Sequence, residues 1–169
     1  MPIFLSTVSL ALFATLLAQG CERVAEPSAP PRDGAAMTSE QLQVTPVFSS
    51  NVSGFSSPAE MVLRDEPALQ KAINEARHDV LMVETPINVD FSRQMVILVA
   101  TGTRNSGGYG IRVDEVNRRD DGVVARYTVT RPGPECMTTQ SITSPVEAVS
   151  VPRMEGPVTF DRREVVEDC

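Results

Sequence analysis

The alternation of apolar and polar positions predicts a domain built mainly from strands. Residues 95–100 (MVILVA) form an unbroken apolar run between Gln94 and Thr101, and Gly102 follows it. The run is too short to span a membrane and is rich in β-branched residues. Such a run is typical of a strand that is covered on both faces. We therefore predict a central strand over Gln94–Thr101.

Shorter apolar segments with turn residues between them predict the other strands. They lie at residues 44–48, 60–64, 111–116, 123–129, 146–151 and 158–162, and residues 103–110 (TRNSGGYG) have the composition of a turn. Together these segments predict a mainly β fold with one short helix, of the α+β class. We expect a twisted antiparallel sheet that closes as a sandwich or an open barrel.

One helix is expected between the second and third predicted strands. Residues 57–60 (SPAE) have the form of a helix-capping sequence, but Pro67 would break a helix that began there. We instead expect Asp65 to cap a helix that runs to about Arg77. Its apolar residues then fall on one stripe that faces the sheet: Leu69, Ala72, Ile73 and Ala76.

A hairpin is predicted where Asp121-Gly122 joins two strands, because this pair is typical of a type I′ turn. In that register Val116 lies opposite Tyr127. The apolar residues earlier in the first strand are then out of phase with Val116. One extra residue near Asp114-Glu115 restores the alternation, so we predict a β-bulge there.

The first twenty residues predict export from the cytoplasm. Residues 1–20 contain no charged side chain and have an apolar centre, as in a signal peptide. Residues 17–21 (LAQGC) resemble a bacterial lipobox, which predicts lipidation of Cys21. Two alternatives stay open: cleavage after Gly20 without a lipid, and a retained membrane anchor.

The chain is expected to divide into three parts. Residues 1–20 are the signal peptide, residues 21–42 are the lipidated cysteine and a disordered tether rich in Pro, Ser and Ala, and residues 43–169 are a single domain. The lipid would hold the domain on a membrane of the bacterial cell envelope. Because Glu22 follows Cys21, we expect the outer membrane, with the domain facing the periplasm or the cell surface.

The last part of the chain supplies a candidate disulfide. A loop at residues 132–144 contains Cys136, and a charged tail, REVVEDC, ends in Cys169. Two cysteines in an exported chain favour a disulfide between them. The alternatives are two unpaired thiols and an intermolecular bond through Cys169.

The sequence contains no recognisable catalytic motif. His78 is the only histidine and is expected at the helix end, and no G-x-S-x-G sequence is present. Residues 102–108 (GTRNSGG) lack the lysine of a phosphate loop, and no Cys/His spacing suits zinc. A net charge of −7 and few aromatic residues argue against nucleic acid. We expect no cofactor, no metal and no enzymatic activity.

Three sequence elements resemble the C-terminal domain of the PrcB family. Members of this family are subunits of bacterial protease complexes. They are residues 89–92 (VDFS), residues 102–109 (GTRNSGGY) and residues 143–145 (TSP), within a region of roughly residues 62–160. Family members often have a tryptophan where Leu69 stands here and an aromatic residue where Val146 stands.

The resemblance implies an interaction or assembly subunit of an extracytoplasmic protease complex, and a protease accessory rather than a protease. Because loops on a rigid scaffold often carry recognition, residues 103–110 and 132–144 are the candidate contact surface. The candidate interaction residues are Arg104, Asn105, Ser106, Gly107, Gly108 and Tyr109. Two alternatives stay open: these loops are connections only, or the lipoprotein binds a small ligand or an envelope polymer.

Overall fold

The computed structural model describes residues 39–77 and 87–169, which belong to one compact unit. The predicted signal peptide, Cys21 and His78 lie outside the described residues, so the proposed division of the N-terminal region stays a prediction. Within the described ranges no helix is both long enough and apolar enough to cross a membrane.

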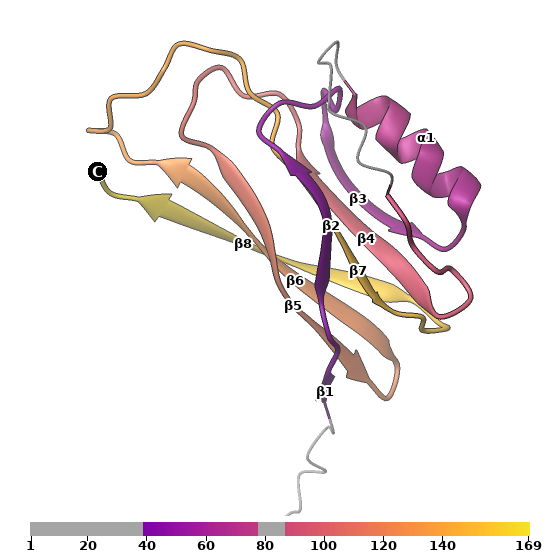
Figure 1. The fold of residues 1–169 in the computed structure, drawn as a ribbon. Helices are drawn as coiled ribbons and strands as arrows, with labels where there is room; N and C mark the ends of the chain where they lie inside the picture. Colours follow the sequence, from indigo (N-terminus) through magenta and orange to yellow (C-terminus); the bar gives the residue numbers. More distant parts are fainter. Residues whose placement is uncertain (1–38, 78–86) are drawn as a thin grey trace, which may run out of the picture. The chain divides into compact units, whose positions relative to one another are not determined.

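Two four-stranded sheets form the domain (Figure 1). Sheet A has the order β1 (Glu40–Gln41), β5 (Gly110–Arg119), β6 (Gly122–Pro132) and β8 (Val158–Glu167). Sheet B has the order β2 (Thr45–Ser50), β7 (Val146–Pro152), β4 (Gln94–Thr101) and β3 (Pro58–Leu63). The predicted α+β class and the sandwich are confirmed, and the sheets do not close into a barrel.

Strand β4 lies in sheet B between β7 and β3 and has one core on each face. Met95, Ile97 and Val99 pack toward sheet A, whereas Val96 and Leu98 pack toward the helix. All five side chains are fully buried. This arrangement explains why the run has no polar position and confirms the predicted central strand.

Helix α1 (Glu66–Ala76) covers the outer face of sheet B (Figure 1). Asp65 caps it, since its side-chain oxygen accepts a hydrogen bond of 2.8 Å from the backbone N–H of Ala68. The predicted apolar stripe is buried, as predicted: Leu69, Ala72, Ile73 and Ala76.

The register of the β5–β6 hairpin differs from the prediction. Arg119 pairs with Gly122, so the two loop residues are Asp120 and Asp121 and Val116 lies opposite Ala125. The reason is a tertiary contact of Gly122, whose φ is +149°. A Cβ there would lie 2.6 Å from the carbonyl oxygen of Pro157, so glycine is needed for this close approach inside the strand.

The predicted β-bulge is confirmed. The register of β5 against β6 shifts between Val113 and Glu115, so Asp114 is the inserted residue. The shift keeps Val113 and Val116 in the core between the sheets.

The two ends of the described chain contribute more structure than expected. Strand β8 runs parallel to β6 and continues to Glu167, so most of the predicted charged tail is an edge strand in an otherwise antiparallel sheet. Ion pairs from Arg126 to Asp161 and from Arg131 to Glu164 join the side chains of these strands. At the other end, β1 pairs with β5 and Leu42 is buried, so the fold includes the last residues of the predicted tether.

Candidate functional site

One end of the sandwich collects three connections and the end of the chain (Figure 1). These segments are residues 51–57, 102–109 and 133–145, together with Asp168 and Cys169. We call this region the loop end. The backbone N–H of Ser53 donates to the Ser144 hydroxyl at 2.7 Å, and the N–H of Ser144 donates to the carbonyl of Asn51 at 3.0 Å. The first connection is thereby fixed to the third.

The two loops predicted to form the contact surface are hydrogen-bonded to each other. Arg104 and Thr143 exchange backbone hydrogen bonds of 2.7 and 3.0 Å, and the N–H of Gly107 donates to the carbonyl of Thr139 at 2.9 Å. The Thr143 hydroxyl also donates to the carbonyl of Ser106 at 2.8 Å. Residues 103–109 and 133–144, hereafter the paired loops, therefore behave as one structural unit.

The two glycines of the GGY element allow this pairing. A Cβ on Gly107 would lie 2.4 Å from the hydroxyl oxygen of Thr139. Gly108 has a φ of +82° and lies against Pro132. The glycines thus have a packing role between the loops.

Arg104 and Tyr109, two of the candidate interaction residues, lie together and are both partly buried. The guanidinium carbon of Arg104 is 5.4 Å from the centre of the Tyr109 ring, a cation–π distance. The same guanidinium donates to the carbonyl of Thr101 at 3.0 Å. These two side chains therefore stabilise the loop at residues 103–109 from its inner side, whereas Asn105 is exposed at the surface of that loop.

The exposed large apolar side chains of the paired loops are ones that sequence reasoning missed. Met137 and Ile142 are both strongly exposed. The signal was available, because both are large apolar residues in a stretch otherwise composed of Pro, Gly, Ser, Thr, Gln, Glu and Cys. Neither belongs to a strand, so no alternation pattern assigned them to the core.

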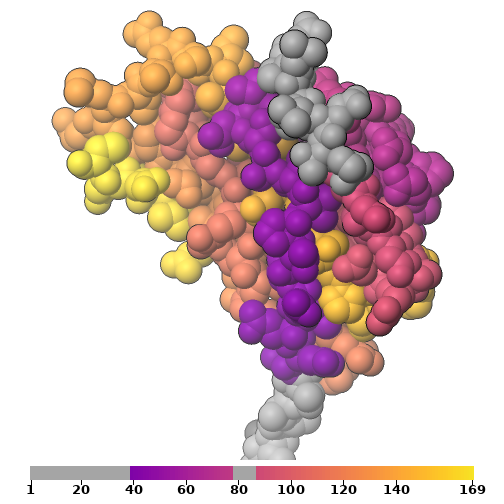
Figure 2. All heavy atoms as spheres, in the orientation of Figure 1, coloured from indigo at the N-terminus to yellow at the C-terminus, as the bar shows by residue number. Residues whose placement is uncertain are grey.

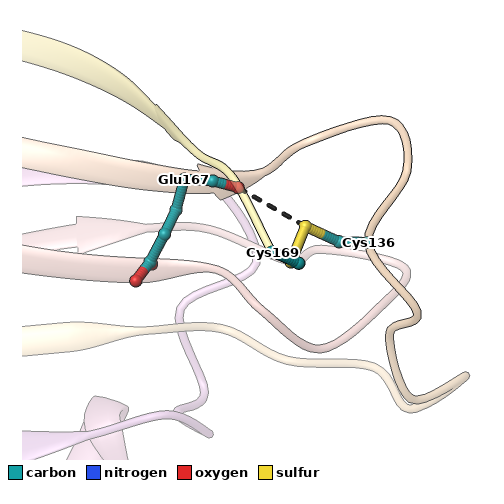
Figure 3. Close-up of a disulfide and its surroundings, with 3 residues drawn as sticks. All are labelled: Cys136, Glu167 and Cys169. Carbon is teal, nitrogen blue, oxygen red and sulfur yellow. Dashed lines mark hydrogen bonds between the residues drawn. A yellow bond between two sulfur atoms is a disulfide. The ribbon is translucent and has the colours of Figure 1, made fainter.

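The candidate cysteines are joined at this end by a disulfide (Figure 3). The Cα atoms of Cys136 and Cys169 are 5.4 Å apart, within the usual range for this bond. The backbone N–H of Gly133 donates to the carbonyl of Glu167 at 2.9 Å. The disulfide and this hydrogen bond fix the end of β8 to the loop that carries Met137.

The other elements of the resemblance also have structural roles. Asp90 accepts hydrogen bonds from the hydroxyl and the backbone N–H of Ser92, in a turn just before β4. These hydrogen bonds lower the pKa of Asp90. At the opposite end of β4, the N–H of Thr101 donates to the carbonyl of Pro145 at 2.9 Å. These contacts fix both ends of the central strand.

Two ionisable groups between the sheets have shifted pKa values, and both have hydrogen-bond partners. Burial, together with a hydrogen bond of 2.6 Å from its hydroxyl to Glu60, raises the pKa of Tyr127. Burial also raises the pKa of Glu147, whose carboxylate accepts from the backbone N–H of Val113 beside the bulge. Among the described residues, no group of three or more His, Cys, Asp and Glu side chains could hold a metal ion.

These features define a two-sheet domain with one helix and an interlocked set of loops at one end. Residues 95–152 match the model of a family described as PrcB C-terminal, which confirms the resemblance. The match begins in β4, includes the paired loops and ends with β7, so it is narrower than the region expected from the sequence. The family name associates this segment with a protease-complex subunit. No curated protein and no solved structure matches the chain.

Leu69 and Val146, where the sequence resemblance led us to expect aromatic residues in family members, lie in the core. Both belong to the apolar cluster between α1 and sheet B and are essentially inaccessible to water. Leu69 lies outside the matched residues 95–152. The surface of the paired loops is built from other residues.

Proposed function

We propose that this chain is a non-catalytic cell-envelope lipoprotein that acts as an assembly subunit of an extracytoplasmic protease complex. The loop end is its contact surface. The observation that carries this proposal is the exposure of Met137 and Ile142 on loops that are held by backbone hydrogen bonds and a disulfide. The family match supplies the class of partner.

The physical argument concerns the cost of ordering a binding surface. A flexible loop loses conformational entropy when it binds, which reduces its affinity. The paired loops are already ordered by their contacts with each other and with the end of β8. Large apolar side chains grouped on such a rigid surface are characteristic of protein-binding sites.

Site-specific photocrosslinking in intact cells tests the contact surface. A photoreactive residue at Met137 or Ile142 is expected to capture a protease or a protease-associated subunit, which mass spectrometry of the product identifies. Matched positions at Asp120 and Glu155 are exposed and lie outside the loop end, so they are expected to capture much less.

Two outcomes would contradict the proposal. Equal capture from all four positions would mean that the loop end is not a specific surface. Capture of glycan or small ligand in place of protein would instead favour the binding lipoprotein that the sequence left open. Circular dichroism of each purified variant checks that the substitutions preserve the fold.

Membrane attachment is a separate part of the proposal. We expect Cys21 to be the first residue of the mature protein and to carry acyl chains, because residues 17–21 resemble a lipobox. Each buried methylene contributes about 0.8 kcal/mol to membrane binding, so two or more chains give stable attachment. Mass spectrometry of the N-terminal peptide measures whether Cys21 is acylated, and Cys21→Ser is the control. An unmodified Cys21 on a protein found in the soluble fraction would contradict this prediction.

A further inference from the structure

The large apolar side chains that are exposed on the described residues belong to the loop end or to the last part of β8, which leads into it. Met137 and Ile142 have exposed fractions of 101 % and 72 %, and Val165 and Val166 at the end of β8 have 37 % and 41 %. The fifth such residue in the described ranges, Val52, lies in the connection that is hydrogen-bonded to Ser144. Single exposed apolar residues are ordinary on protein surfaces, whereas a group of them at one end marks a binding surface.

Two adjacent grooves lie beside these side chains. The first, of about 270 Å³, is lined by Met137, Pro132, Glu167 and both cysteines of the disulfide. The second, of about 540 Å³, is lined by Val165, Val166 and again Glu167. Arg112 also lines the second groove, where its guanidinium is paired with Asp114. Because they share Glu167, the grooves form a path across the end of β8. Figure 2 shows the loop that carries Met137, in orange, beside the yellow C-terminal residues.

Two acidic residues line this path, and a third precedes the disulfide in the chain. Glu167 lines both grooves, Asp168 lines the second, and the exposed Glu135 directly precedes Cys136. None of these three carboxylates forms a salt bridge with another residue of the described chain, whereas nearby Arg131 is already paired with Glu164. The path thus combines apolar contact with carboxylates that have no ion-pair partner among the described residues, and the cation that lines it, Arg112, is already paired with Asp114.

We propose that these grooves bind an extended segment of the protein partner that carries apolar side chains next to lysine or arginine. This inference rests on the proposed function and specifies the chemistry of its partner. An apolar side chain of the segment lies against Met137 and the disulfide. The adjacent cations approach Glu135, Glu167 and Asp168, whose carboxylates form no ion pair within residues 39–77 and 87–169. Complementary charge of this kind selects the partner and raises the association rate.

Peptide binding to the purified full chain tests this chemistry. The probes are three fluorescent peptides that alternate leucine with lysine, serine with lysine, or leucine with glutamate, measured by anisotropy. The leucine–lysine peptide is expected to bind best, because it supplies both apolar contact and positive charge. The variant Glu135→Lys/Glu167→Lys should weaken its binding by about tenfold or more.

A matched variant separates local recognition from the overall negative charge. Asp120→Lys/Asp121→Lys makes the same change of charge at the β5–β6 turn, where neither carboxylate forms a salt bridge with a described residue. It should weaken binding by less than about twofold. Equal weakening by both variants, or tighter binding of the leucine–glutamate peptide, would overturn the inference.

The crosslinking experiment distinguishes this inference from the proposed function. If Met137 still captures the protease-associated subunit in Glu135→Lys/Glu167→Lys, the function stands and the basic–apolar partner chemistry is wrong. If the variant loses capture and Asp120→Lys/Asp121→Lys retains it, the inference is supported. Both variants must give circular dichroism spectra that match those of the unchanged protein. The variant Glu135→Gln/Glu167→Gln removes the two negative charges without reversing them and serves as a milder change of charge.

Discussion

Replacing both Cys136 and Cys169 by serine is expected to lower the free energy of unfolding by about 2–4 kcal/mol. The disulfide joins residues that are 33 positions apart, so it restricts the unfolded chain over the whole of β7 and β8. Its loss also frees the end of an edge strand whose side chains are largely exposed. Chemical denaturation of the purified domain, followed by circular dichroism, measures the effect.

The unchanged protein under reducing conditions is the natural control for this prediction. It should unfold at the same denaturant concentration as the double serine variant, because both lack only the covalent link. Thiol titration of freshly isolated, denatured protein should find neither Cys136 nor Cys169 reactive. Two reactive thiols, or equal stability of oxidised and reduced protein, would show that the bond does not contribute in this way.

The sequence was sufficient for the elements whose signal is local. The apolar run of β4 requires cover on both faces, and the structure provides the two cores. The helix is specified by its cap and by its periodicity. Asp65 followed by Pro67 marks its start, and an apolar stripe runs from Leu69 to Ala76. The bulge at Asp114 was also predictable, because the core positions of β5 align with those of β6 only if one residue is inserted.

Elements that depend on distant partners could not be read in the same way. The hairpin register is set by the approach of Pro157 to Gly122, and nothing near Asp121 in the sequence records that contact. Residues 163–167 (REVVE) resemble a charged tail, since their apolar and polar side chains do not alternate as they would in a half-buried strand. They form a strand because β6 offers a free backbone edge beside them.

The candidate site was only partly predictable for a related reason. Its turn residues indicated a loop, whereas the contact between Arg104 and Tyr109 was found only in the structure. The hydrogen bonds between Arg104 and Thr143 join residues far apart in sequence, so they appear only in the fold. Met137 and Ile142 were overlooked because apolar residues outside a periodic pattern have no assigned face.

The largest effect of a single substitution is expected from Leu69→Ala. Leu69 is fully buried between α1 and sheet B, where its neighbours in the apolar cluster include Val96, Leu98 and Val146. Removing the side chain leaves a cavity, because packed neighbours relax only partly, and should cost about 2–5 kcal/mol of unfolding free energy. Gln70→Ala is the matched control on the exposed face of the helix and should change stability by less than about 0.5 kcal/mol.

A second substitution at the same position tests whether this core has room for the tryptophan that the sequence resemblance led us to expect there. Leu69→Trp adds a large ring to a cluster in which Leu69 is already inaccessible to water. Overpacking of this kind costs about 1–3 kcal/mol, so the variant should unfold at a lower denaturant concentration than the unchanged protein. Partner capture through Met137 should be preserved in the folded variant, because Leu69 belongs to the helix-side core and not to the grooves at the loop end. A Leu69→Trp protein that is as stable as the original would instead mean that the helix shifts easily to accept the ring, and that packing under α1 places little constraint on this position.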